Sequence, residues 1–189
     1  MKRYPSLVLG LFMLLLIPAL LPAQRLFTRD AKVYFDATSK NSPERVDATN
    51  KSGTLVLDVA TSKVQAAVLM TNFVFEKALM QEHFNENYVE SAKYPKATFK
   101  GKIDDPAKVS FSKDGNYTVT VSGDLTMHGV TKSVKAPATI VVKGDKVSAS
   151  TTFDVKLADY AISVPSVVAD KLSTQAKITF DSTLEPMKK

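Results

Sequence analysis

The sequence predicts an all-β protein in which about eight antiparallel strands close into a barrel. Apolar and polar residues alternate through most of the chain, and a period of two is typical of a strand with one buried and one solvated face. Clusters of turn-forming residues separate these runs at the spacing of hairpins. A long antiparallel sheet must also protect its edges, and closure into a barrel removes them.

The most regular alternation runs from residue 117 to residue 127. Its apolar side chains fall on one face: Tyr117, Val119, Val121, Leu125 and Met127. The pair His128-Gly129 follows, and the alternation resumes at Val130. Glycine accepts a positive φ, and histidine tolerates it better than most residues, so the pair predicts a two-residue hairpin loop.

The other strands are recognised by the same alternation. In chain order they are expected at residues 31–37, 54–59, 63–70, 73–75, 97–103, 147–157 and 175–184. Turn-forming residues fall at 50–53, 104–106, 113–116 and 143–145.

Two segments depart from the strand pattern. From Glu76 to Tyr88 the apolar residues recur at spacings of three and four, which predicts a short helix that ends before Pro95. From Pro165 to Leu172 the pattern predicts one or two helical turns, because proline suits a helix entrance.

The start of the chain has the pattern of an export signal. Two basic residues precede an apolar run at residues 7–21, and the small residue Ala23 follows. The run has about fifteen residues, fewer than the roughly 20 that a membrane-spanning helix needs. We therefore expect a signal peptide over residues 1–23, cleaved after Ala23, and a single barrel domain over residues 24–189 in the periplasm or secreted.

The charge pattern limits the classes of binding partner that we expect. The chain carries a formal net charge of +6, but its lysines are spread singly and do not cluster with aromatic residues. We therefore expect no nucleic-acid partner. Weak attraction to anionic lipid headgroups leaves a transient contact with a membrane surface open, and the sequence also leaves a homodimer open.

The residues of common catalytic and metal sites are scarce. Cysteine is absent, and the two histidines, His83 and His128, stand in no metal-binding spacing. The chain has no G-x-S-x-G elbow, and Asp104-Asp105 lies in a turn with a proline. We therefore expect no catalytic residue, no metal site and no cofactor, and a protein that is not an enzyme.

Small residues fall on the expected inner face of the barrel. They are Ala66, Gly101, Gly123, Ala136, Ala138, Ala149 and Ala176. Small inner residues are compatible with a hollow interior that holds one elongated ligand, and equally with an interior filled by neighbouring phenylalanines. Periodicity alone leaves both alternatives open.

Three blocks carry a family resemblance. They are LTMHGVTK at residues 125–132, HFN at 83–85 followed by KYPKATF at 93–99, and FDV at 153–155 leading to DY at 159–160. In order and spacing they resemble the YceI family of exported bacterial proteins. The resemblance implies a lipocalin-like, eight-stranded barrel with a helical segment near its mouth, which binds long isoprenoid chains in its interior. Where some members carry a D-x-F-F-D/N segment, this chain has EHFNENY at 82–88, so the chemistry of the mouth differs.

The candidate ligand site follows from the inner register and this resemblance. Its expected wall residues are Phe35, Val68, Phe73, Phe75, Phe99, Val119, Val121, Phe153 and Phe180. Its expected lid residues are Leu79, Met80 and Phe84. The expected ligand is a polyprenyl lipid or an isoprenoid quinone, held for transport, storage or protection of the envelope. The alternative is a non-enzymatic envelope or stress module with a filled barrel that acts through its surface.

Overall fold

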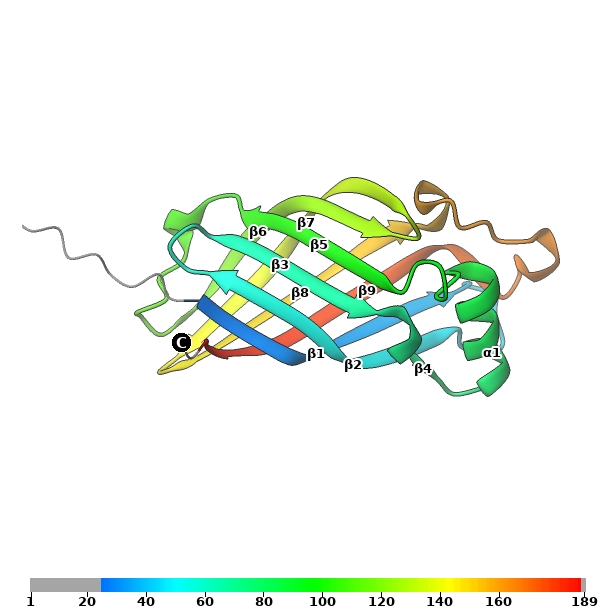
Figure 1. Ribbon diagram of the computed structural model, residues 1–189, viewed down its shortest axis with the longest axis horizontal. Coiled ribbons are helices and arrows are strands. Elements are labelled where there is room, and N and C mark those ends of the chain that lie inside the picture. Colours follow the sequence, from blue (N-terminus) through cyan, green and yellow to red (C-terminus); the bar gives the residue numbers. More distant parts are fainter. Residues whose placement is uncertain (1–24, 188–189) are drawn as a thin grey trace, which may run out of the picture.

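Eight long strands wrap into a closed antiparallel barrel in the computed structural model, which describes residues 25–187 (Figure 1). The strands are β1 (Arg25–Thr38), β2 (Asp47–Asp58), β3 (Lys63–Leu69), β4 (Val74–Phe75), β5 (Lys96–Ile103), β6 (Gly115–Met127), β7 (Val130–Lys143), β8 (Lys146–Lys156) and β9 (Leu172–Pro186). Their order is β1-β9-β8-β7-β6-β5-β3-β2, and the pairing of β1 with β2 closes the ring. The short β4 is an extra strand beside β2. The predicted fold class is confirmed, whereas the expected signal peptide at residues 1–23 lies outside the described residues.

Helical turns occupy the connections between strands. They are η1 (Met70–Asn72), α1 (Ala78–His83), η2 (Phe84–Tyr88), η3 (Pro106–Lys108), η4 (Leu157–Tyr160) and η5 (Ser166–Val168). Within residues 25–187 no helix has both the length and the apolar character needed to cross a membrane.

The helix predicted from Glu76 to Tyr88 is shorter and less regular than expected. It begins at Ala78, because Lys77 is still extended (φ −109°, ψ 127°) after the pairing of β4 with β2. The Phe75 backbone N–H donates to the Gln81 side-chain oxygen (3.2 Å), which fixes the entry of the chain into the helix. The second half of the segment, η2, is wound as a π-helix.

The second predicted helical segment is also reduced. Only η5 is helical between Pro165 and Leu172, because Leu172 already pairs with Thr38 as the first residue of β9. The predicted strand ends Met70 and Leu157 likewise belong to the helical turns η1 and η4.

The turn predicted at residues 50–53 is wrong, since these residues lie inside β2. The fully buried Asn50 donates its side-chain amide to the Leu69 carbonyl (2.9 Å) and accepts from the Ser52 N–H (2.8 Å). The pairing with β1 is irregular here, and Gly53 stands opposite Ala31 beside a register shift. The turn-like residues therefore accommodate an irregularity in a continuous strand.

The hairpin predicted at His128-Gly129 is confirmed. Residue Met127 of β6 pairs with Val130 of β7, and the two loop residues have φ of 50° and 73°. Both values are positive, as the favoured two-residue loop requires.

The two ends of the barrel are closed in different ways. The end that carries both Arg25 and Met187 is filled by a cluster of buried aliphatic side chains, on which Val109 and Phe111 of the β5–β6 connection pack. That cluster is Leu26, Leu55, Leu57, Ile103, Val119, Ile140, Val142, Val147 and Leu184. At the opposite end of the barrel α1 lies beside the strand ends (Figure 1). We call the α1–η2 segment, residues 78–88, the lid.

Candidate functional site

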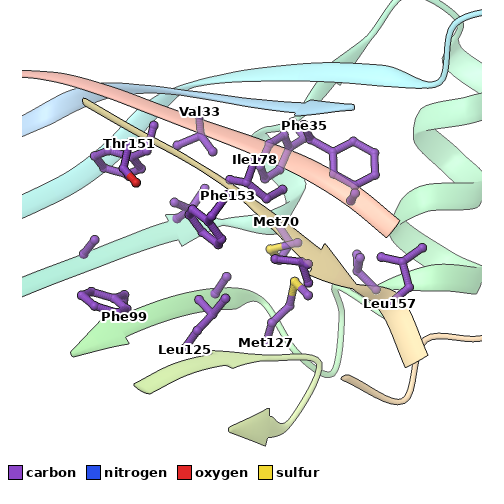
Figure 2. A pocket seen from close by; sticks show the side chains of 18 of the residues that line it. Val33, Phe35, Met70, Phe99, Leu125, Met127, Thr151, Phe153, Leu157 and Ile178 are labelled. Atoms are coloured by element: carbon purple, nitrogen blue, oxygen red, sulfur yellow. The ribbon is translucent and has the colours of Figure 1, made fainter. Parts of the chain in front are cut away.

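The inner faces of the barrel do not meet, and a cavity of about 570 Å³ lies between the filled end and the lid. Figure 2 shows apolar side chains from opposite walls directed into this space, among them Phe99, Leu125 and Phe153. These three are only partly buried, although they point inward, because they face the cavity. The volume falls in the range of roughly 300–1,000 Å³ that is typical of small-molecule sites.

The structure places eleven of the twelve predicted site residues on the cavity wall. They are Phe35, Val68, Phe73, Phe75, Leu79, Met80, Phe84, Phe99, Val121, Phe153 and Phe180. Val119 is the exception, because it is buried in the aliphatic cluster that fills the far end. The contact of these residues with a ligand stays a prediction.

Sequence reasoning missed several wall residues. Leu125 and Met127 share the inner face of β6 with Val121, so the alternation already identified their side of the strand. Ile178 on β9 follows the same rule, two residues before Phe180. Met70 continues the alternation of the strand predicted at 63–70, in phase with Val68, and it reaches the wall although it belongs to the helical turn η1.

Small residues shape the cavity in two distinct ways. Gly101 and Gly123 face each other on β5 and β6, and a Cβ on either would lie within 2.8 Å of the Phe99 ring. They therefore make room for that ring to lie against the sheet, and do not themselves create open space. The predicted inner alanines do line the cavity: Ala66, Ala136, Ala138, Ala149 and Ala176.

Four phenylalanines stand beneath and within the lid. Phe84 of η2 packs against Phe35 of β1, Phe73 and Phe75 with ring centroids 5.0–5.7 Å apart and interplanar angles of 49–63°. Tilted and edge-to-face arrangements are favourable for aromatic rings. The lid is thus held over the cavity chiefly by apolar contact.

Charged side chains on the cavity wall come from the lid end of the barrel. Lys77, which precedes α1, forms an ion pair with Glu44 of the β1–β2 connection. The hydrogen bond to Glu44 raises the pKa of Lys77, which keeps its ammonium charged. His83 of α1 and Lys171, next to β9, also contribute to the wall. The interior therefore combines an apolar tunnel with charged groups near one opening.

The wall chemistry suits an elongated amphiphile. Away from the charged end, the hydroxyl of Thr151 is the polar group that Figure 2 shows on the wall. Within residues 25–187 no group of three or more histidine, aspartate or glutamate side chains is placed to hold a metal ion. The space is thus suited to burying an apolar chain while its polar end reaches the lid region.

The closed barrel and its apolar cavity define a hollow antiparallel barrel of the lipocalin-like type. Residues 27–184 match the model of the YceI-like domain, so the chain belongs to the YceI-like family. It is 33% identical over 87 residues to protein YceI of Escherichia coli, covering 46% of this chain and 41% of that protein. A UPF0312 protein of Vibrio parahaemolyticus is 34% identical over 90 residues, covering 47% of this chain and 43% of the relative. These matches span about two fifths of the length of each relative.

A solved structure shares the whole architecture. A polyisoprenoid binding domain from Saccharophagus degradans superposes with a TM-score of 0.72 at 17% identity, over 87% of this chain and 99% of that domain. At this identity the likeness establishes the fold.

Proposed function

We propose that the protein holds an amphiphile with a long apolar chain, an isoprenoid lipid or quinone, inside the barrel. The observation that carries this proposal is the apolar cavity of about 570 Å³, filled at one end and covered by the lid at the other. Burying an apolar chain contributes roughly 0.8 kcal/mol per CH₂, so a chain of ten carbons would be held by about 8 kcal/mol before the costs of ordering. The hollow interior favours this function over a filled barrel that acts through its surface.

The polar end of the ligand is proposed to lie at the lid. Lys77 and Lys171 line the cavity there, and both can donate hydrogen bonds to phosphate, hydroxyl or carbonyl oxygens. The isoprenoid character is supported by the polyisoprenoid binding described for the Saccharophagus degradans domain. In the exported protein this activity would serve lipid transport, storage or envelope protection in the periplasm or outside the cell, without catalysis.

Apolar side chains at the lid end support a transient contact with a membrane during loading. Val74 of β4, Leu79 of α1 and Val167 of η5 are all strongly exposed, and Val167 reaches 84%. Figure 1 shows β4, α1 and the η4–η5 connection at the same end of the barrel. Contact of this end with a bilayer would let an apolar chain enter the cavity without crossing water.

The proposal is tested by native mass spectrometry of the mature protein, purified without detergent from the cell that makes it. We expect a discrete added mass that fragments as an isoprenoid, and a single bound molecule for each barrel. A bare polypeptide that stays bare after incubation with polyprenols and with isoprenoid quinones would overturn the proposed function.

A further inference from the structure

Three sequence blocks, distant along the chain, meet at the imidazole of His128. The ring nitrogen Nδ1 lies 2.9 Å from the backbone carbonyl oxygen of Tyr160, and Nε2 lies 2.7 Å from Oε2 of Glu90. The Tyr94 ring stands edge-on to the imidazole, with centroids 4.8 Å apart. His128 thereby joins the β6–β7 turn, the turn η4 and the chain that leaves the lid toward β5.

The chemistry of the two partners fixes the protonation that this contact requires. A backbone carbonyl and a carboxylate both accept hydrogen bonds and donate none. A neutral imidazole has a single N–H, so it can donate to only one of them. His128 makes both bonds only as the imidazolium, whose charge the Glu90 carboxylate balances. The ring is largely shielded from water, with 11% of the side chain exposed against 44% for Glu90.

The backbone around this contact is unusual. Glu90, His128 and Ala161 have φ of 44°, 50° and 57°, and they are three of the four non-glycine residues with positive φ within residues 25–187. The hairpin accounts for His128 alone. Strained residues persist where the surrounding structure over-determines them, and they concentrate at functional sites. Ala161 is the C-cap residue of η4, whereas Glu90 and His128 hold this backbone and contact each other directly, which indicates a role for their contact beyond the turn.

The contact lies at the downstream end of the lid. Upstream, the lid is secured by the backbone pairing of β4 with β2. Downstream, Glu90 lies two residues after the end of η2, and its bond to His128 links this segment to the β6–β7 turn, beside the contact of Tyr94 with the same ring. Loss of that bond would leave the downstream end of the lid attached by the apolar contacts of Phe84 and Val89 alone, while the upstream end stays paired to the sheet.

We propose that His128 is a positioning residue, which as an imidazolium bonds both Glu90 and the Tyr160 carbonyl and so clamps the downstream end of the lid. As a neutral imidazole it keeps the bond to the buried Tyr160 and gives up Glu90, whose half-exposed carboxylate bonds water instead. The inference deepens the proposed function, because the lid covers the cavity that would hold the lipid. Raising the pH, which removes the second proton of the imidazole, therefore releases the lid, and lowering the pH closes it.

Other titratable groups surround the imidazole. The segment after η2 contributes Glu90, Tyr94 and Lys93, whose Nζ lies 4.9 Å from the Tyr94 ring centroid. The turn η4 contributes Tyr160, whose buried hydroxyl has no hydrogen-bond partner, and the exposed Asp159. The hydrogen bond to Tyr94 raises the pKa of Lys93, and burial raises the pKa of Tyr160, so neither group loses its proton near neutral pH. The lid itself also carries His83 of α1, so the variants below are needed to assign a pH response to His128.

Hydrogen–deuterium exchange of the lid amides in the empty protein, at about pH 5.5 and about pH 8, tests the clamp directly. In the unmodified chain we expect about tenfold faster exchange at the higher pH, after correction for the intrinsic pH dependence of exchange. In Glu90→Gln we expect the pH dependence of lid exchange to vanish while the lid stays protected. The glutamine amide N–H can donate to the Nε2 of a neutral imidazole, whose Nδ1–H donates to the Tyr160 carbonyl.

Two further variants separate the clamp from the turn. Asparagine suits the first position of this loop, so His128→Asn keeps the hairpin and should leave the lid exchanging rapidly at both pH values. Glu86→Gln removes an exposed carboxylate from the same lid and should behave as the unmodified chain. Equal exchange rates of the lid amides at the two pH values in the unmodified chain would overturn the proposed clamp. A pH dependence that persists in Glu90→Gln would overturn it as well.

The protonation state of His128 can also be measured directly. Nitrogen-15 NMR of the imidazole should show both His128 nitrogens protonated at the lower pH, and a single protonated nitrogen there would contradict the proposal. Neither measurement needs a ligand. A lid that responds to pH in a barrel that takes up no lipid would leave the clamp intact and refute only the proposed function.

Discussion

Filling the cavity without disturbing the barrel tests whether the hollow interior is the ligand site. Ala149 lies on β8 between Ile140 of β7 and Ser182 of β9, and its methyl group lines the cavity. In Ala149→Trp the indole would exclude on the order of five chain carbons, which at roughly 0.8 kcal/mol each corresponds to about 4 kcal/mol. We expect binding of a long-chain polyprenol or a fluorescent polyene fatty acid to weaken about a thousandfold.

Folding should survive this change, because the indole enters space that is already empty and apolar. We expect the thermal midpoint to change little, or to rise, as the ring buries apolar area. Thr152→Trp is the matched control: it lies on the same strand, exposed on the outer face, and should bind the probe as the unmodified chain does. Undiminished binding by a folded Ala149→Trp protein, or equal losses in both variants, would refute the reasoning.

Three other outcomes follow from the structure. Gly123→Ala should cost about 1–3 kcal/mol in urea unfolding, since its Cβ would lie 2.4 Å from the backbone of β5; an unchanged stability would contradict this close approach. Burial, and then the hydrogen bond to Asp47, raise the pKa of Tyr34 to about 12, so folding favours the protonated phenol. Stability from this group is therefore complete below pH 10 and is lost as the pH rises through about 12, and Tyr34→Phe should remove that loss in urea titrations. Val167→Asp should reduce flotation with phosphatidylglycerol vesicles, whereas Met187→Asp at the filled end should not, and equal effects would argue against contact through the lid end.

The regular strands were predictable because their determinants are local. The alternation through residues 117–127 and the pair His128-Gly129 specify a hairpin within a short stretch of chain, and both are confirmed. The same reasoning failed at residues 50–53, where the polar side chain of Asn50 bonds to Leu69 of a neighbouring strand and the chain stays extended. It also placed the helix start at Glu76, although pairing of β4 with β2 keeps the chain extended through Lys77.

The sequence predicted which strand face the wall residues share, but it did not predict which of them border a cavity. Val121 and Val119 share that face of one strand, yet Val121 borders the cavity and Val119 lies in the aliphatic cluster. Periodicity reports the side of the sheet toward which a residue points, and it carries no information about its height along the barrel axis.

The sequence by itself determined the strand alternation, the closed antiparallel architecture and the family, because these depend on periodicity and on short specific blocks. Only the tertiary structure decided that the interior is hollow, since a void depends on how side chains from all walls meet. It likewise changed the role of His128. The sequence accounts for this residue as half of a turn, and the fold brings Glu90 and the Tyr160 carbonyl to its two nitrogens, across separations of 38 and 32 residues.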